Sequence, residues 1–264
     1  MRSLDQGRYE VKHLVPLAIR DTMLAAAGDA VIPDPHGRAL EGGGSGYIVH
    51  STYFDTPDLM DYTSRLAEHR VRLRTRIRTY GAPGDHAPVF LELKRKLDDQ
   101  VIKQREKVCD ADTWATFGDA PWEHLYEDKR PAVRAIAQRF GSIVAERGLV
   151  PWVSVHYHRE VYIDVRPDAG RVRLTIDRQI TGSTRPNTCD LYPKADFALF
   201  PDDLCVVELK FAGTEPLWMR RLARELGLRP EPISKFALTM ARALRGDHPH
   251  EFARLLPRAA RSVA

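Results

Sequence analysis

The chain has 264 residues, 43% of them hydrophobic, and a formal net charge of +4 at pH 7. It is long enough to bury a sizeable core. Its modest charge is spread through strand-like segments, which argues against a basic tail for nucleic acid and therefore against a nucleic-acid partner. Three cysteines without metal-ligand spacing, the lack of a signal-peptide pattern and the lack of any stretch near the roughly 20 apolar residues of a membrane span predict a soluble cytoplasmic protein.

The predicted elements are mostly strands. In chain order, alternating or short apolar runs predict strands over 8–14, 47–54, 70–80, 89–96, 101–108, 152–165, 171–180 and 204–211. Helical spacing predicts helices over 17–28, 58–64, 110–117, 129–140, 215–226 and 234–244, with Ser234 capping the last. The glycine-rich segment 34–46 is predicted to be a loop. Because the strand pattern continues without a linker, we expect one domain over 1–246 and a basic tail over 247–264.

The segment 70–80, RVRLRTRIRTY, has an arginine at every second position. Successive side chains of a strand point to opposite faces, so this spacing places five guanidinium groups on one face and a mostly apolar row on the other. Five like charges cannot form the dry side of a core, so either water or a polyanion must lie among them. A face simply exposed to water is the simpler interpretation of one such strand.

The same pattern recurs in other predicted strands. Their charged face carries Arg8, Glu10, Lys12, Glu92, Lys94, Lys96, Lys103, Arg105, Lys107, Arg173, Asp177, Glu208 and Lys210. A sheet that closes on itself with these faces inward would form a cationic tunnel able to hold a ligand. We therefore predict an α+β fold, a closed antiparallel β-barrel of about eight strands with helices outside it and capping its ends.

Nine motifs in order carry a family resemblance: YEVKHLVP, STYFDTPDLMDY, RIRTYG, FLELKRK, IKQREK, HYHREVY, VRLTID, VVELKF and ISKFAL. Over about residues 8–244 the chain resembles the VTC domain, the polyphosphate polymerase domain of the vacuolar transporter chaperone complex. That domain is a member of the triphosphate tunnel metalloenzyme (CYTH-like) superfamily. The resemblance implies an antiparallel barrel whose basic lumen holds a chain of phosphates, with Mn²⁺ or Mg²⁺ on a tunnel glutamate.

The resemblance also implies roles for individual residues. The positions that match the family's catalytic basic residues are Lys12, Arg76, Arg78, Lys94, Lys103, Arg159 and Lys235. Glu208 matches the metal-binding glutamate, for which a salt bridge to a lumen arginine is the simpler structural role. Strand alternation adds Arg8, Arg72, Arg74, Lys96, Arg105, Arg173 and Lys210 as phosphate-binding candidates. By the same alternation, Glu10 and Glu92 are further candidate metal ligands.

Two departures from the family pattern bear on the chemistry. Pro232 stands where the fungal enzyme has a second lysine, one helical turn before Lys235. Arg8 stands where the hydrolytic branch of the superfamily has the first glutamate of E-x-E-x-K, which argues against a standard two-metal triphosphatase. His156 and His158 share a strand face without a third ligand in view, so no zinc site is predicted.

Three functions remain open. The leading hypothesis is a phosphotransferase that moves the terminal phosphate of a nucleoside triphosphate onto polyphosphate. The alternatives are a tripolyphosphate or nucleoside triphosphate hydrolase and a non-catalytic module that binds polyphosphate or another polyanion. Because the fungal polymerase works beside transmembrane partners, the resemblance also implies a separately encoded membrane partner, which would hold this domain at the inner face of a membrane.

Overall fold

The computed structural model describes residues 8–40, 43–98, 100–165, 172–245, 254–257 and 260. The strands are β1 Arg8–Pro16, β2 Val31–Pro33, β3 Arg38–Ala39, β4 Ser45–Asp55, β5 Val71–Tyr80, β6 Pro88–Leu97, β7 Gln100–Asp110, β8 Val150–Asp164, β9 Arg173–Thr184, β10 Phe197–Ala198 and β11 Leu204–Ala212. The α-helices are α1 Arg20–Ala27, α2 Met60–Leu66, α3 Ala111–Ala115, α4 Pro131–Arg147, α5 Leu217–Glu225 and α6 Lys235–Ala243. Among the helices of the described ranges, none is both long and apolar enough to cross a membrane.

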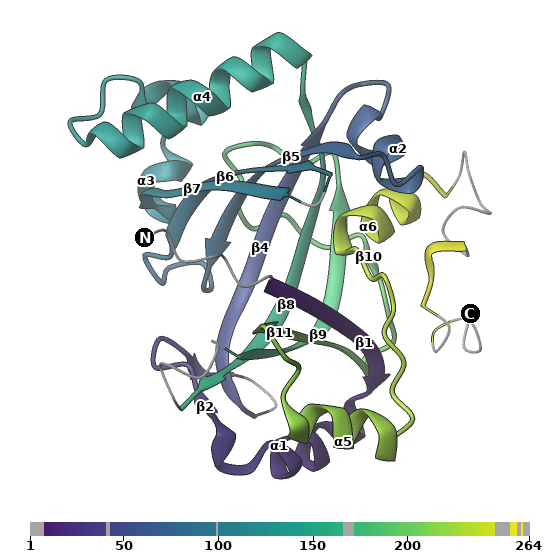
Figure 1. Cartoon of the computed structure of the whole chain (residues 1–264). Coiled ribbons are helices and arrows are strands. Elements are labelled where there is room, and N and C mark those ends of the chain that lie inside the picture. The colour runs from purple at the N-terminus through teal and green to yellow at the C-terminus, as the bar shows by residue number, and fades with distance from the viewer. Residues whose placement is uncertain are drawn as a thin grey trace, which may run out of the picture.

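The strands form one antiparallel sheet that curls around a central space (Figure 1). Eight main strands follow the order β1-β11-β9-β8-β4-β5-β6-β7, and the short β2, β3 and β10 pair with β8, β4 and β9. The predicted α+β tunnel of about eight strands is therefore confirmed. Its closure differs from the prediction, because the path of hydrogen-bonded strands in the described chain ends at β1 and β7. Both edge strands carry inward cations, and like charges opposite one another disfavour strand pairing.

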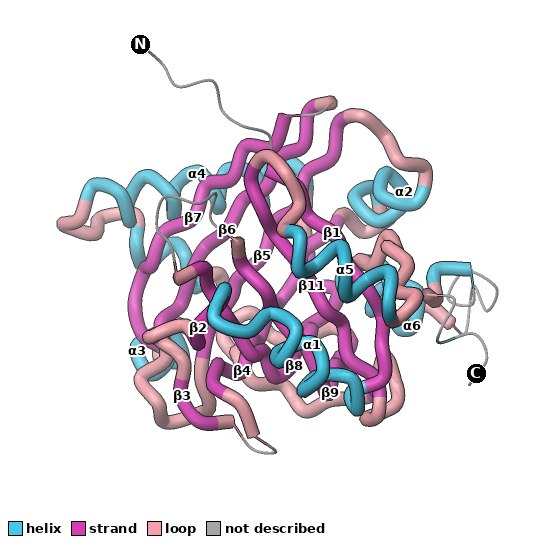
Figure 2. The backbone as a smooth tube through the Cα atoms, turned by 60° about the horizontal axis from the view of Figure 1, so that its bottom comes forward, coloured by secondary structure: helices cyan, strands magenta, loops and turns pink. Residues whose placement is uncertain are grey.

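Helices cover two regions of the outer face of the sheet, as predicted. Outward apolar residues of β5, β6 and β7 pack against α3 and α4, and Ile77, Leu91, Trp114 and Phe140 belong to one buried cluster. On the other side, β1, β9 and β11 pack against α1 and α5, which lie side by side across the strands in Figure 2. These apolar layers direct the opposite, charged faces of the same strands into the central space.

The last helix fills one end of that space. Ser234 caps α6 as predicted, since its hydroxyl accepts a hydrogen bond from the Ala237 N–H. Phe236 and Met240 of α6 are buried among inward apolar residues of β1, β4, β8 and β11. Leu256 is buried in the same cluster, whereas most of the predicted tail over 247–264 lies outside the described residues.

One helix boundary differs clearly from the prediction. α4 continues to Arg147, past the end expected at residue 140. Gly141 lies inside the helix, where Tyr126 packs closely against it. A side chain is excluded there, because a Cβ would lie 1.8 Å from the Tyr126 hydroxyl oxygen. Gly148, in the left-handed conformation at φ 59°, ends the helix instead.

Candidate functional site

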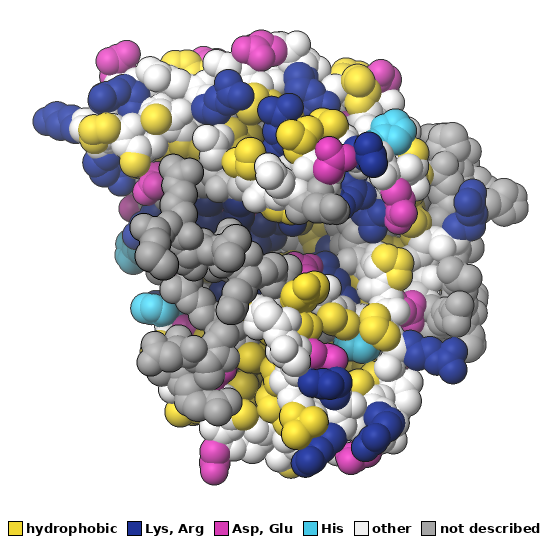
Figure 3. Space-filling view, viewed as in Figure 1, with side chains coloured by type: hydrophobic (Ala, Val, Ile, Leu, Met, Phe, Trp, Pro, Cys, Tyr) yellow, Lys and Arg dark blue, Asp and Glu magenta, His cyan; other side chains and the backbone are white. Residues whose placement is uncertain are grey.

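The inner face of the eight main strands, termed the lumen from here on, gathers most of the basic residues predicted from strand alternation. In Figure 3 this side of the molecule is hollowed near its centre, with Lys and Arg side chains lying in the hollow. The β6 and β1 sides of the lumen lie close to one another. Lys94 of β6 is near enough to Glu10 and Lys12 of β1 to interact with them electrostatically. In the part of the chain that the structure describes, the two edges of the sheet therefore face the same interior.

The arginine strand β5 supplies three cations to the lumen. Arg76 donates to Tyr53 Oη over 3.0 Å, and Arg78 donates to Ser51 Oγ over 2.8 Å. Arg74 lies over the ring of Phe236 on α6, at 4.7 Å from its centroid. Arg70 is the exception in the alternating row, because it lies before β5, is exposed and pairs with Asp98.

Glu92 of β6 is the counter-ion of this wall. It is 1% exposed. Its Oε2 accepts a hydrogen bond from Arg76 Nε at 2.7 Å, and its Oε1 forms ion pairs with Arg105 Nε at 3.0 Å and Lys103 Nζ at 3.5 Å. Burial alone would raise the pKa of Glu92, but Arg76, Arg78 and Lys103 outweigh it and lower the pKa to about 2. Glu92 is therefore ionised at neutral pH, and its charge is shared among three cations.

On the wall formed by β1 and β11, two carboxylates alternate with two lysines. Lys12 Nζ lies 2.8 Å from Glu10 and 3.8 Å from Glu208, and Lys210 contacts Glu208 closely and lies 3.6 Å from Glu10. Burial opposes ionisation of Glu208, but Lys12 and Lys210 hold its pKa far below the usual range. Glu208 is thus an acceptor-only carboxylate at neutral pH.

The third wall joins β8, β9 and α6 through a residue that sequence reasoning did not select. Asp177 is fully buried and accepts from Arg159 at 2.6 and 2.7 Å and from Lys235 at 2.6 Å. Burial would raise the pKa of Asp177, and the two cations lower it instead. Its alternation with Arg173 on the charged face of β9 was the only sequence signal for a lumen position.

The other predicted phosphate-binding residues differ in their distance from these three groups. Arg173 donates to Tyr47 Oη over 2.6 Å, and Arg105 lies over the ring of Phe90. Arg72 and Lys96 are paired in register, four residues along β5 from Arg76, about 13 Å at the rise of a strand. The side chain of Arg8, at the start of β1, lies outside the described residues.

The donor set around Glu208 is compatible with a hard divalent cation. Glu10 and Glu208 offer carboxylate oxygens that share the same two lysines. Thr175 faces Glu208 in the β9–β11 register, and its buried Oγ1 has no hydrogen-bond partner among the described residues. Mg²⁺ and Mn²⁺ prefer such oxygen ligands and leave the remaining positions to water or phosphate.

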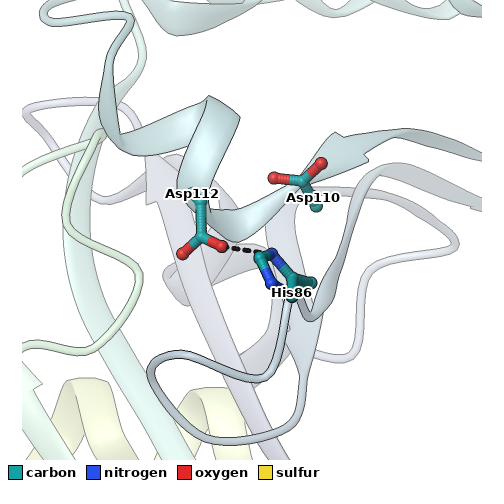
Figure 4. A group of neighbouring side chains, drawn as sticks. All are labelled: His86, Asp110 and Asp112. Atoms are coloured by element: carbon teal, nitrogen blue, oxygen red, sulfur yellow. Dashed lines mark ion pairs between the residues drawn. The ribbon is translucent and has the colours of Figure 1, made fainter.

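A second group of possible metal ligands lies outside the lumen. His86, Asp110 and Asp112 bring their ligand atoms within 4.8 Å of one another near the start of α3 (Figure 4). His86 Nδ1 pairs with Asp112 at 2.5 Å, and Asp110 caps α3 by accepting from the Thr113 N–H at 2.9 Å. These contacts, in a largely exposed position, account for the grouping without an ion.

Fold and site together define a class: a tunnel-fold protein whose curled antiparallel sheet surrounds a strongly cationic lumen with buried carboxylates among the cations. The family model of the VTC domain matches residues 7–244, and the chain therefore belongs to the VTC domain family. This finding confirms the resemblance read from the nine motifs.

The chain is also similar to a solved structure from Hippeastrum, described as a candidate adenylyl cyclase with a dominant triphosphatase activity. The two share 18% sequence identity over 89% of this chain and 96% of that one, with a TM-score of 0.46. No curated protein sequence matches the chain significantly.

Proposed function

We propose that this VTC-family domain is a divalent-metal-dependent phosphotransferase that moves the terminal phosphate of a nucleoside triphosphate onto polyphosphate inside the lumen. The observation that carries the proposal is the convergence of Arg76, Arg78, Arg159 and Lys235 on one interior beside the carboxylate of Glu208. Guanidinium groups bind phosphate oxygens with strong, directional hydrogen bonds. A row of them suits an extended polyanion better than a compact ligand.

Phosphoryl transfer requires little covalent chemistry from protein, so positioning and charge neutralisation supply most of the acceleration. Asp177 fixes Arg159 through its Nε and Nη2 atoms, which leaves Nη1 to meet a phosphate oxygen. The same carboxylate holds Lys235 in place. Cations held in place before the substrate arrives lose little freedom when a phosphate chain binds.

Glu208, assisted by Glu10, would hold the Mn²⁺ or Mg²⁺ ion. When bound, the ion would neutralise charge on the phosphate oxygens during transfer. Lys12 and Lys210, which neutralise the two carboxylates in the free protein, would then turn toward the phosphate chain. The start of β1 favours transfer over hydrolysis, because Arg8 stands where a two-metal hydrolase would carry another carboxylate.

The proposal extends to the organisation of the chain. It keeps a single domain over 1–246 and a basic tail over 247–264, and it includes a separately encoded membrane partner that would hold the domain at the inner face of a membrane. Fractionation of cells after gentle lysis tests this part: recovery with membranes that is lost on washing with salt supports a peripheral attachment. Recovery in the soluble fraction under all conditions contradicts it.

The test of the activity is incubation of the pure protein with ATP and Mn²⁺, followed by separation of the products. Long polyphosphate supports the proposal, release of free phosphate alone supports the hydrolase, and binding of ATP without turnover supports the non-catalytic module. Arg76→Ala should abolish product formation. Arg139→Ala, which removes an exposed arginine of α4, is the matched control and should be active.

A further inference from the structure

Tyr53 occupies an unusual position for a phenol. It lies on the inner face of β4, is 5% exposed, and packs against Phe236 with ring centroids 5.2 Å apart. Its hydroxyl oxygen accepts the 3.0 Å hydrogen bond from Arg76 Nη1, and the same guanidinium carbon lies 5.6 Å from its ring centroid. The oxygen thus lies within the arginine wall of the lumen.

The charges around this phenol do not balance. Those that face it are Arg74, Arg76 and Arg78 from β5, with Glu92 from β6 paired to Arg76. Tyr157 from β8 also interacts with Tyr53, and Lys235 from α6 lies over the Tyr157 ring. Three guanidinium groups against one carboxylate leave an excess of positive charge beside the Tyr53 oxygen. Such an excess favours the anionic form of any acid placed there.

The arginines outweigh burial in setting the pKa of Tyr53, which supports an anionic form. Burial opposes ionisation of Tyr53, but Arg76, Arg78 and Arg74 outweigh it and lower its pKa from 10.0 to about 7. Tyr157, which lies in the same lumen, shows the opposite result: burial raises its pKa. The lowering therefore accompanies the contact with arginines, since the pKa of Tyr80, beside Arg78 and Arg105, is lowered as well.

We propose that Tyr53 is the proton-exchanging counter-ion of the lumen: a phenolate when the lumen holds no anion, and a neutral phenol when a phosphate chain lies on Arg74, Arg76 and Arg78. The incoming phosphates neutralise the guanidinium groups that stabilise the phenolate, and the oxygen then takes one proton from solvent. Only an O–H bond forms. The inference rests on the proposed function in one respect, since it takes the ligand to be a chain of phosphates.

Linkage fixes the direction of the pH effect. Binding that takes up a proton weakens as the pH rises above the pKa of the free phenol, by up to about tenfold in affinity per pH unit. Below about pH 7 the phenol is already protonated, and Tyr53 contributes no coupling there. Because phosphates titrate as well, the informative quantity is the ratio of wild-type to Tyr53→Phe affinity, which should fall between pH 7 and 9.

Two measurements test the proposal. Absorbance of tyrosinate near 295 nm, followed in the free protein from pH 5.5 to 9, should show one tyrosine ionising near neutral pH, and tripolyphosphate should move that step upward. Tyr53→Phe should remove the step, and Tyr157→Phe should keep it. Calorimetry of tripolyphosphate binding at pH 8, in two buffers of different ionisation enthalpy, should show uptake of up to one proton in wild type and less in Tyr53→Phe.

The outcomes separate this inference from the proposed function. If tripolyphosphate binds with equal proton uptake to wild type and Tyr53→Phe, or if wild type shows no tyrosinate step below pH 9, the inference is wrong. If neither protein binds tripolyphosphate, the proposed function is wrong, and the absorbance titration still decides the ionisation of Tyr53. Should Tyr53→Phe fail to fold, the titrations of wild type and Tyr80→Phe decide the question, since Tyr80 is the other phenol whose pKa arginines lower: a step kept in Tyr80→Phe supports Tyr53, and a step lost there contradicts it.

Discussion

Glu92→Gln removes the buried negative charge that Arg76, Lys103 and Arg105 share. The pKa of Glu92 falls from 4.5 to about 2 in the folded protein. A difference of about 2.5 pH units, at about 1.4 kcal/mol each, makes about 3 kcal/mol of stability at pH 7. For a chain of this size such a loss lowers Tm by roughly 6–12 °C.

The sign of the pH dependence follows from the lowered pKa. A carboxyl group with a depressed folded-state pKa stabilises the protein above its unfolded-state value of 4.5 and loses that contribution as the pH falls toward about 2. The difference between wild type and Glu92→Gln should therefore be constant above about pH 5.5 and shrink to about 1.4 kcal/mol at pH 3. Urea denaturation followed by tryptophan fluorescence at both pH values measures it.

Glu146→Gln is the matched control, because it makes the same chemical change on the exposed face of α4. It should leave the unfolding free energy within about 0.5 kcal/mol of wild type. The reasoning is refuted if Glu92→Gln is as stable as wild type at pH 7, or if its deficit does not change down to pH 3. Tripolyphosphate should also raise the Tm of Glu92→Gln by more than that of wild type, since three cations then lack their counter-ion.

Three further predictions concern Glu208 on the wall formed by β1 and β11, the phosphate contacts and α6. Glu208→Gln should lose Mn²⁺-dependent turnover of ATP but keep its calorimetric affinity for tripolyphosphate, since cations hold most phosphate oxygens; wild-type turnover would contradict a role as metal ligand. Lys94→Ala should weaken tripolyphosphate binding about tenfold or more, as expected for loss of a hydrogen bond to a charged group. It should also make the binding less sensitive to added salt. If the variant binds as tightly as wild type at both low and high salt, Lys94 is excluded from the site. Ser234→Ala should cost about 1 kcal/mol through loss of the α6 cap, visible as a Tm lowered by roughly 2–4 °C, and an unchanged Tm would contradict it.

The sequence predicted the lumen because side-chain direction in a strand depends only on position. Alternation alone placed Arg76 and Arg78 inside, and the structure places both among partners from β4 and β6. The same rule fails at Arg70, where the strand has not yet begun. The curl of the sheet could be inferred from the recurrence of the pattern, whereas its missing closure between β1 and β7 depends on pairings between strands distant in sequence.

The cations with which the lumen carboxylates pair could not be predicted in the same way. Asp177 meets Arg159 because the two are partners in the β8–β9 register, and Lys235 reaches them from α6. Register is set by the whole sheet and is not encoded in one segment. The special position of Tyr53 has the same origin, because its neighbours on β5 and α6 meet it only in the folded protein.

The most direct test of the central claim is a crystal structure of the protein with tripolyphosphate and Mn²⁺, with the metal located from its anomalous signal. The account predicts a phosphate chain along the lumen, in contact with Arg76, Arg78, Lys94 and Arg159, and an anomalous peak within coordination distance of Glu208. A chain bound to the outer surface would contradict the claim. A metal peak at His86 and Asp112 with none at Glu208 would contradict the proposal that Glu208 holds the metal.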